Sequence, residues 1–224
     1  MPSSSTERRS TSPLPTPPLL VLTDRRASVL PLRAVVAAAL AGGCRWFAVR
    51  EKDLAPDGLA DLVADVVALA KPYGATVLVA GVADAAVAAR IARTSAANGV
   101  HLPRDGDVAA ARTALGPNAL VGLSAHDLRE VERAAAAGAD YVTLSPVFAS
   151  ASKPGYGPAL GRARLEAVAR ATDVPVLALG GIATRDDVAA CRTAGAAGVV
   201  VMGAVARAGD PRSVVTELIE GWSA

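Results

Sequence analysis

Short apolar runs alternate with segments of helical period along nearly the whole chain. β-branched or leucine-rich runs predict strands at Leu19–Leu22, Trp46–Val49, Thr76–Val79, Val100–Leu102, Leu120–Leu123, Tyr141–Leu144, Val176–Leu179 and Val199–Met202. Helical periodicity predicts helices at Leu30–Ala41, Leu59–Ala70, Asp84–Thr94, Val108–Leu115, Asp127–Ala137, Arg162–Ala171, Asp186–Ala194 and Arg212–Glu220. Apolar strands between amphipathic helices are typical of a parallel sheet covered by helices. This number of units predicts an α/β fold, a (β/α)8 TIM barrel in a single domain.

A doubly wound sheet is the main alternative to the barrel. The even repeats, and the lack of a Gly-x-Gly-x-x-Gly motif after the first strand, favour the barrel. Glycines end helices just before strands at Ala41-Gly-Gly43, Ala137-Gly-Ala139 and Ala194-Gly-Ala196, as C-cap glycines do. The loops after the strands are more polar, and in a barrel those loops hold the active site.

Composition narrows the class of protein. Residues 1–18 are rich in Ser, Thr and Pro without the apolar core of a signal peptide, so we expect a disordered extension before a domain spanning 19–224. A net charge of +2 and an aromatic content of 3% argue against nucleic-acid binding, and no run is apolar enough to span a membrane. Cys44 and Cys191 lack metal-binding spacing, which favours small apolar roles in a reducing, cytoplasmic setting.

Glycines follow the last two predicted strands. Gly180 and Gly181 follow the seventh, and Gly203 with Ala204 follows the eighth. Glycine at these places lets backbone N–H groups approach a ligand, and the loops after strands seven and eight of such barrels often bind phosphate. The alternative is that these glycines only shape tight turns.

Two cations follow the second predicted strand. Arg50 and Lys52 are spaced by two, so they point the same way if strand geometry continues, and they offer two positive charges to a carboxylate or phosphate. The neighbouring acids, Glu51 and Asp53, are expected to be solvated. A wholly solvated loop is the alternative.

Both histidines fall at strand ends. His126 follows the fifth strand just after Ser124, and histidine titrates close enough to neutrality to shuttle protons. The alternative is local capping, in which Ser124 or Asp127 caps the next helix. His101, before Leu102 and Pro103, is expected to be structural.

The longest loop of the folded part runs from Pro146 to Gly161. Ser150, Ser152 and Lys153 offer two hydroxyls and an ammonium, which suit an anion, and the Pro- and Gly-rich remainder is typical of an active-site lid. An ordinary surface loop is the alternative.

Taken together, these motifs resemble the thiamine phosphate synthase superfamily, which also contains thiazole tautomerases. The resemblance runs from Val21 to the end of the chain. It rests on Arg50-Glu-Lys52, Gly99-Val-His-Leu102, Gly122-Leu-Ser-Ala-His126, Ala139-Asp-Tyr-Val142, Ser145-Pro-Val-Phe148 and Leu179-Gly-Gly-Ile182. It implies a (β/α)8 barrel, often a homodimer, that acts on thiazole phosphates in vitamin B1 synthesis.

The resemblance also implies roles for single residues. Thiazole phosphate would be held by Gly180, Gly181, Gly203 and Ala204, and pyrophosphate by Ser150, Ser152 and Lys153. Arg50 and Lys52 match the family's basic motif after strand two.

Departures from the synthase pattern fall at its pyrimidine and magnesium positions. Ala48 stands where the synthase has Gln. Ala80-Gly81-Val82 replaces Asn-Asp-Arg, in which Asn recognises the pyrimidine and Asp binds magnesium. Pro103-Arg-Asp-Gly106 replaces a motif with a second magnesium ligand. If magnesium binds here, Asp24, Asp105 and Asp107 are the candidate ligands.

These departures favour the tautomerase branch. We expect a thiazole tautomerase without metal or other cofactor, in which His126 shuttles the proton and Lys52 or Arg50 holds the substrate carboxylate. Ser124 joins the substrate-binding residues, and the partner is a phosphorylated thiazole, with no nucleic acid or membrane. Two alternatives stay open: a thiamine phosphate synthase that uses Mg²⁺, and a non-catalytic phosphate-binding or regulatory barrel.

Overall fold

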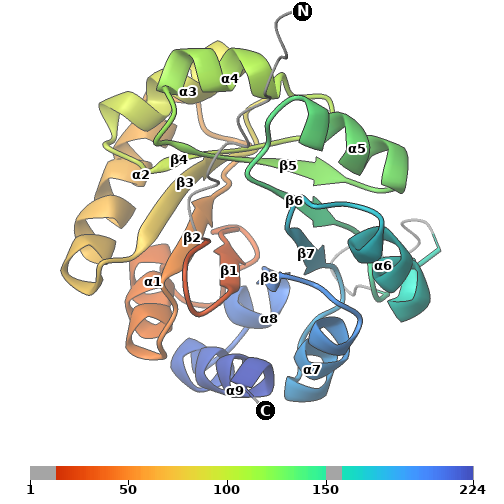
Figure 1. Ribbon diagram of the computed structural model, residues 1–224. Helices are drawn as coiled ribbons and strands as arrows, with labels where there is room; N and C mark the ends of the chain where they lie inside the picture. Colours follow the sequence, from red (N-terminus) through yellow and green to blue (C-terminus); the bar gives the residue numbers. More distant parts are fainter. Residues whose placement is uncertain (1–13, 150–157, 224) are drawn as a thin grey trace, which may run out of the picture.

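Parallel strands close into a barrel in the computed structural model, which describes residues 14–149 and 158–223 (Figure 1). Each strand pairs with the next along the chain, and the last pairs with the first, so the predicted barrel is confirmed. The strands are β1 (Leu19–Leu22), β2 (Trp46–Val49), β3 (Thr76–Ala80), β4 (Gly99–Leu102), β5 (Leu120–Ala125), β6 (Tyr141–Leu144), β7 (Val176–Leu179) and β8 (Gly198–Val201).

Helices surround the barrel on the outside (Figure 1). They are α1 (Leu32–Ala41), α2 (Pro56–Ala70), α3 (Ala85–Thr94), α4 (Val108–Leu115), α5 (Leu128–Ala136), α6 (Gly161–Arg170), α7 (Arg185–Thr193), α8 (Gly203–Ala206) and α9 (Pro211–Ser223), with a short 3₁₀ turn η1 (Lys71–Tyr73). The sequence pattern did not predict α8 or η1, because one turn of helix is too short to show a period. Helix α9 packs against α7 and α1 and completes the ring.

Local signals in the sequence set where the helices begin and end. Asp84, Asp107 and Asp127 are N-caps whose carboxylates accept a backbone N–H three residues on, at 2.9 Å in each case. At the other ends, Gly138 and Gly195 have φ of 85° and 81°, in the left-handed region that glycine tolerates.

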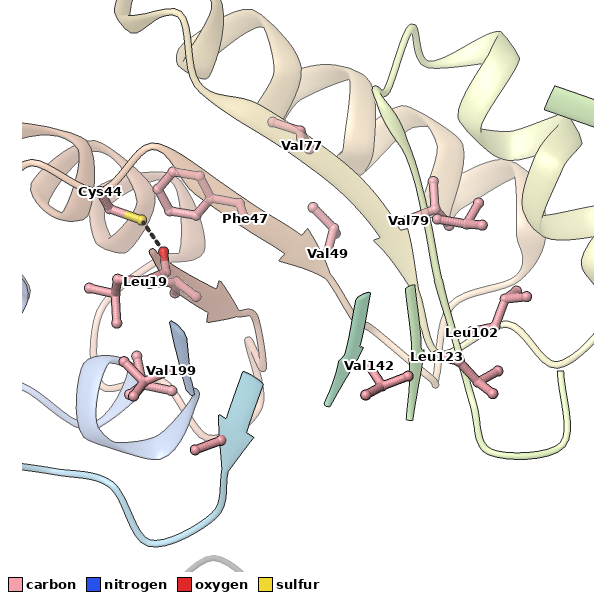
Figure 2. Close-up of a cluster of buried hydrophobic side chains, with 14 of the residues drawn as sticks. Leu19, Cys44, Phe47, Val49, Val77, Val79, Leu102, Leu123, Val142 and Val199 are labelled. Atoms are coloured by element: carbon pink, nitrogen blue, oxygen red, sulfur yellow. Dashed lines mark hydrogen bonds between the residues drawn. The ribbon is translucent and has the colours of Figure 1, made fainter. Parts of the chain in front are cut away.

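Strand residues alternate between the interior of the barrel and its helical coat. The interior cluster contains Leu20, Leu22, Trp46, Ala48, Leu78, Ala80, Leu120, Tyr141, Leu177 and Val200. The outer cluster lies between strands and helices, and Figure 2 shows several of its members, among them Val77, Val79 and Leu102. Cys44 belongs to this outer cluster, with its thiol hydrogen-bonded to the carbonyl of Trp46 at 3.3 Å and that of Leu19 at 3.7 Å.

The expected disordered extension, residues 1–18, lies mostly outside the described residues, since the structure describes the chain from residue 14. Leu14 packs against the interior cluster, and the carbonyl of Pro18 accepts a hydrogen bond from the N–H of Val199 at 2.9 Å. Within the described ranges, no helix combines the length and apolar character needed to cross a bilayer.

Candidate functional site

The candidate residues gather at one rim of the barrel. Because all strands are parallel, their carboxyl ends meet at the same face. Arg50 and Lys52 follow β2, Ser124 lies in β5 and His126 just after it, and the remaining described candidates follow β7 and β8. Ser150, Ser152 and Lys153 lie outside the described residues. The sequence prediction therefore placed its described residues on the correct face, while their roles stay predictions.

The turn after β7 depends on its two glycines. Gly180 and Gly181 have φ of 104° and 68°, and a Cβ on Gly181 would lie 2.5 Å from the carbonyl oxygen of Ala149 and 2.6 Å from Cβ of Phe148. The N–H of Phe148 donates to the carbonyl of Gly180 at 3.0 Å. These contacts pack the start of the β6–α6 loop directly onto the turn, so any side chain at position 181 would displace that loop.

The turn after β8 leads straight into α8. Gly203 and Ala204 form the first turn of this helix, where backbone N–H groups have no acceptor within the helix. The Arg207 side chain folds back over Gly203, since a Cβ there would lie 2.7 Å from the guanidinium carbon. Backbone N–H groups at the start of a helix, beside a guanidinium, suit a phosphate. Sequence reasoning missed Arg207, although its spacing of four from Gly203 is one helical turn.

Both ends of the long β6–α6 loop are fastened beside the same glycines. The N–H of Leu160 donates to the carbonyl of Pro146 at 2.8 Å, and the N–H of Gly161 donates to that of Val147 at 2.9 Å. The described residues on either side of 150–157 therefore lie next to Gly180.

The cations after β2 lie together over the end of β3. A Cβ on Gly81 would lie 3.0 Å from Cγ of Arg50 and 3.5 Å from Cγ of Lys52. The two side chains therefore point to the same side, as their spacing predicted. They line an open pocket of about 300 Å³ together with Asp24, Arg26, Glu51 and Asp53.

Of the two acids next to these cations, Asp53 is exposed, as expected, whereas Glu51 is not, which corrects the prediction for Glu51. Its side chain is buried, with the residue 3% exposed. Its carboxylate accepts hydrogen bonds from the Thr23 hydroxyl at 2.7 Å and from the backbone N–H of Arg25 at 3.1 Å. Asp53 accepts two hydrogen bonds from the guanidinium of Arg25, at 2.9 and 2.8 Å. Both acids are thus tied to the β1–α1 loop.

His126 is held at two points. Its backbone N–H donates to the Glu130 carboxylate at 2.7 Å, and its ring Nδ1 lies 2.7 Å from the carbonyl oxygen of Ser145. A carbonyl can only accept, so Nδ1 carries a hydrogen, and in the neutral ring the lone pair is on Nε2. This tautomer is the one a proton acceptor at Nε2 requires.

Ser124 faces a buried polar network rather than the following helix, which Asp127 caps. The hydroxyl of Ser124 lies 3.0 Å from Nε2 of His101, whose Nδ1 lies 3.0 Å from the Tyr141 hydroxyl. Burial and, to a smaller extent, the positive charge of Arg50 together lower the pKa of His101 to about 4. His101 is therefore neutral near pH 7 and structural, as expected, while Ser124 links this network to the rim.

The described carboxylates do not fit the magnesium site that the family resemblance implies. Mg²⁺ in phosphate chemistry needs one or two carboxylates besides the phosphate oxygens. Asp107 caps α4, Asp24 accepts the N–H of Ala27 at 3.1 Å, and the 78% exposed side chain of Asp105 pairs with Arg104 at 3.4 Å. Residues 150–157 contain no Asp, Glu or His. In the described ranges, no three His, Cys, Asp or Glu side chains are grouped to hold a metal.

Comparison with known proteins identifies the family. The sequence model described as thiamine monophosphate synthase matches residues 19–205. A putative thiamine-phosphate synthase of Geobacter sulfurreducens is 39% identical over 203 residues, covering 90% of this chain and 92% of the relative. A thiamine-phosphate synthase of Anaeromyxobacter dehalogenans is 42% identical, covering 84% of this chain and 81% of the relative. The chain belongs to the thiamine monophosphate synthase family, whose enzymes act in thiamine biosynthesis.

Solved structures agree with this assignment. A thiamine phosphate pyrophosphorylase from Pyrococcus furiosus superposes with a TM-score of 0.79 at 27% identity, covering 92% of this chain and 95% of the other. Orotidine 5'-phosphate decarboxylase of Pyrococcus horikoshii superposes with a TM-score of 0.66 at 16% identity, covering 92% of this chain and 99% of the other. The second likeness shows the barrel fold alone. Because the matching relatives are named as synthases, the comparisons do not support the expected closer relationship to the tautomerase branch.

Proposed function

We propose that this chain is a thiamine phosphate synthase, which joins hydroxymethylpyrimidine diphosphate to thiazole phosphate and releases diphosphate. The sequence analysis placed this activity second, behind the tautomerase. The names of the relatives reverse that order. The observation that carries the proposal is the presence of two separate places for phosphoryl groups at one rim: the glycine turns after β7 and β8, and the Arg50–Lys52 pair after β2.

The reaction suits what this rim offers. The C–O bond between the pyrimidine methylene and the diphosphate breaks, and diphosphate leaves with the bonding electron pair. The thiazole ring nitrogen donates its lone pair to form the new C–N bond. That nitrogen carries no hydrogen, so the step needs no general base. It needs orientation of the two substrates and stabilisation of the charge that develops on the leaving group.

Each described group then has a role in binding. The backbone N–H groups of Gly181, Gly203 and Ala204, with Arg207 beside them, hold the thiazole phosphate. Arg50 and Lys52 meet the diphosphate from the β2 side of the rim and offset its charge as the C–O bond lengthens. The family resemblance adds Ser150, Ser152 and Lys153 to the diphosphate site, although these residues lie outside the described part of the chain.

The direct test is turnover with both substrates. The full-length protein, hydroxymethylpyrimidine diphosphate and thiazole phosphate are incubated, and thiamine phosphate and diphosphate are quantified together. We expect the two products in equal amounts. Lys52→Met should lower kcat/KM by about tenfold or more, because it removes a charge-assisted contact to the leaving group. Lys71→Met, which removes an exposed lysine from a helix end, is the matched control and should leave the rate unchanged.

A thiazole tautomerase is the second candidate, favoured by the fixed tautomer of His126 with its lone pair on Nε2. Proton NMR in D₂O follows aromatisation and deuterium uptake of the non-aromatic carboxythiazole phosphate with wild type and His126→Ala. Fast aromatisation that the variant abolishes, without thiamine phosphate synthesis in the first assay, would reverse the order of the candidates. Ligand binding without either reaction would support a non-catalytic barrel. A cytoplasmic location and a homodimer stay predictions.

A further inference from the structure

Gly81 directly follows β3, and the side chains of Arg50 and Lys52 lie over it. Its φ is 80°, and a Cβ there would lie tightly against the stem of Arg50 and in ordinary contact with the stem of Lys52. The nearest approaches to a Cβ at this position are 3.0 Å from Cγ of Arg50, 3.5 Å from Cγ of Lys52 and 3.9 Å from Cε of Lys52. Two positive side chains therefore lie where a carboxylate at the end of β3 would stand.

The negative charges of the same segment are directed elsewhere. Glu51 is buried against Thr23 and the backbone of Arg25, and Asp53 pairs with the Arg25 guanidinium at 2.8 Å. The side chains of this segment therefore point to two sides: the acids point toward the β1–α1 loop, and the cations point toward Gly81. Glu51 and Asp53 line the same pocket, but their carboxylates accept hydrogen bonds from the β1–α1 loop, while the stems of Arg50 and Lys52 lie over Gly81.

The pocket beside these cations has a suitable size and lining for a compact polyanion. Its volume of about 300 Å³ is at the lower end of the range for small-molecule sites, roughly 300–1,000 Å³. Three cations, Arg26, Arg50 and Lys52, line the pocket together with three acids, Asp24, Glu51 and Asp53, whose carboxylates accept hydrogen bonds from the β1–α1 loop. A guanidinium binds phosphate oxygens in a bidentate manner, while an ammonium acts as a compact point charge, so the pair can share the oxygens of a diphosphate.

We infer that this pocket binds diphosphate through Arg50 and Lys52 without a divalent cation, and that Gly81 leaves the room for them to do so. The inference rests on the proposed function for the identity of the anion, a leaving diphosphate. Its chemistry follows from charge: side-chain cations can offset the negative charge that a metal ion would otherwise neutralise. Because magnesium bound to free diphosphate lowers the charge of the anion, added Mg²⁺ should not strengthen binding here.

Calorimetric titration of the full-length protein with inorganic pyrophosphate tests the inference. We expect binding in EDTA with an affinity at least equal to that in excess Mg²⁺. Arg50→Met and Lys52→Met should each weaken binding in EDTA by about tenfold or more, and Lys71→Met should not change it. Binding that appears only with Mg²⁺, or that is unaffected by both substitutions, would overturn the inference.

Substitutions at Gly81 distinguish the effect of steric crowding from the effect of an added negative charge. Gly81→Ala introduces a Cβ against Arg50 at a left-handed φ, whereas Gly81→Asp adds a negative charge to the same crowding. We expect Gly81→Asp to weaken metal-free binding well beyond Gly81→Ala, with both variants checked for native circular dichroism. Equal binding by the two variants would count against the charge argument. Where either fails to fold, the Arg50 and Lys52 variants decide the question.

The two proposals can fail separately. Thiamine phosphate synthesis that requires Mg²⁺, together with pyrophosphate binding that requires Mg²⁺, would overturn the metal-free site and leave the synthase standing. Metal-free binding that depends on Arg50 and Lys52, without thiamine phosphate synthesis, would support the site and overturn the synthase.

Discussion

The buried carboxylate of Glu51 accepts a hydrogen bond from the Thr23 hydroxyl at 2.7 Å, and the Thr23 oxygen in turn accepts the backbone N–H of Arg50 at 2.9 Å. This chain of contacts joins the loops after β1 and β2. It also holds the backbone from which Arg50 and Lys52 reach over Gly81. In the proposed diphosphate site, Glu51 would therefore position Arg50 through two hydrogen bonds, by way of Thr23.

Replacing Glu51 tests this coupling. Glu51→Gln keeps the shape but replaces one acceptor oxygen with an amide that faces the N–H of Arg25. We expect the free energy of unfolding to fall by about 1–3 kcal/mol, because a buried donor loses its partner. Pyrophosphate affinity should fall too. Urea denaturation and calorimetric titration measure the two effects, with Asp65→Asn on the exposed face of α2 as the control.

A loss of stability without any change in pyrophosphate affinity would show that Glu51 supports the fold alone. Thr23→Val provides a second check, since it removes the same link while keeping the size of the side chain. Both variants should weaken pyrophosphate binding if the link positions Arg50.

A buried ion pair stabilises the opposite face of the barrel. The guanidinium of Arg112 pairs with Asp140, whose carboxylate also accepts the N–H of Val121 at 2.7 Å, and the two side chains are 9% and 14% exposed. Replacing Arg112 leaves the buried charge of Asp140 without its partner, so Arg112→Met should lower the free energy of unfolding by about 3–5 kcal/mol. Arg33→Met, which breaks an exposed pair with Asp65, should cost no more than about 1 kcal/mol. Urea denaturation gives both values, and equal losses would contradict the argument.

The buried His101 predicts a dependence of stability on pH. Its folded-state pKa is about 4 while an exposed histidine titrates near 6.5, so between these values the unfolded chain binds more protons. Stability should therefore fall as the pH drops from about 6.5 toward 4, by as much as about 3 kcal/mol from this group. Denaturation in urea across this pH range measures the slope.

Substitution assigns that slope to one residue. His101→Gln keeps an amide able to meet Ser124 and Tyr141 but cannot titrate, so its stability should change less between pH 6.5 and 4, whatever its stability at pH 7. His126→Gln removes the other histidine of the chain and should retain the wild-type slope. An unchanged slope in His101→Gln would assign the acid sensitivity to carboxylates instead.

Both cysteines should be unreactive in the folded protein. Cys44 and Cys191 are buried, and burial raises the pKa of each thiol to about 12. A thiol-specific chromogenic reagent at neutral pH should label neither in native buffer and both after denaturation. Fast labelling of native protein would show that the outer core opens at α1 or α7. Cys44→Ala and Cys191→Ala distinguish the two positions.

Much of the fold could be predicted because strands and helices carry their own periodicity. Four strands begin and end where the apolar runs predicted, and the others differ by no more than two residues at an end. The order of the strands followed from repetition, since parallel neighbours joined by helices close in chain order. The single turn of α8 was not predicted, because four residues are too few to show a helical period.

The site was only partly predictable. Spacing by two placed Arg50 and Lys52 on one side, and strand ends placed His126 at the rim, because both depend on local geometry. Glu51 was expected in solvent, since nothing nearby in sequence indicates the hydroxyl of Thr23, which is 28 residues away. The contact between the Ser124 hydroxyl and His101 likewise joins two strands, β5 and β4, so the local sequence did not indicate it.

By itself, the sequence determined the barrel, the rim at which the candidate residues lie and the family to which the chain belongs, because repetition and short motifs act through neighbouring residues. Only the tertiary structure decided which charges are buried, which carboxylates are already bound, and that two cations fill the space over Gly81. Those facts depend on contacts between residues far apart in the chain, whose strength is set by burial and distance rather than by spacing.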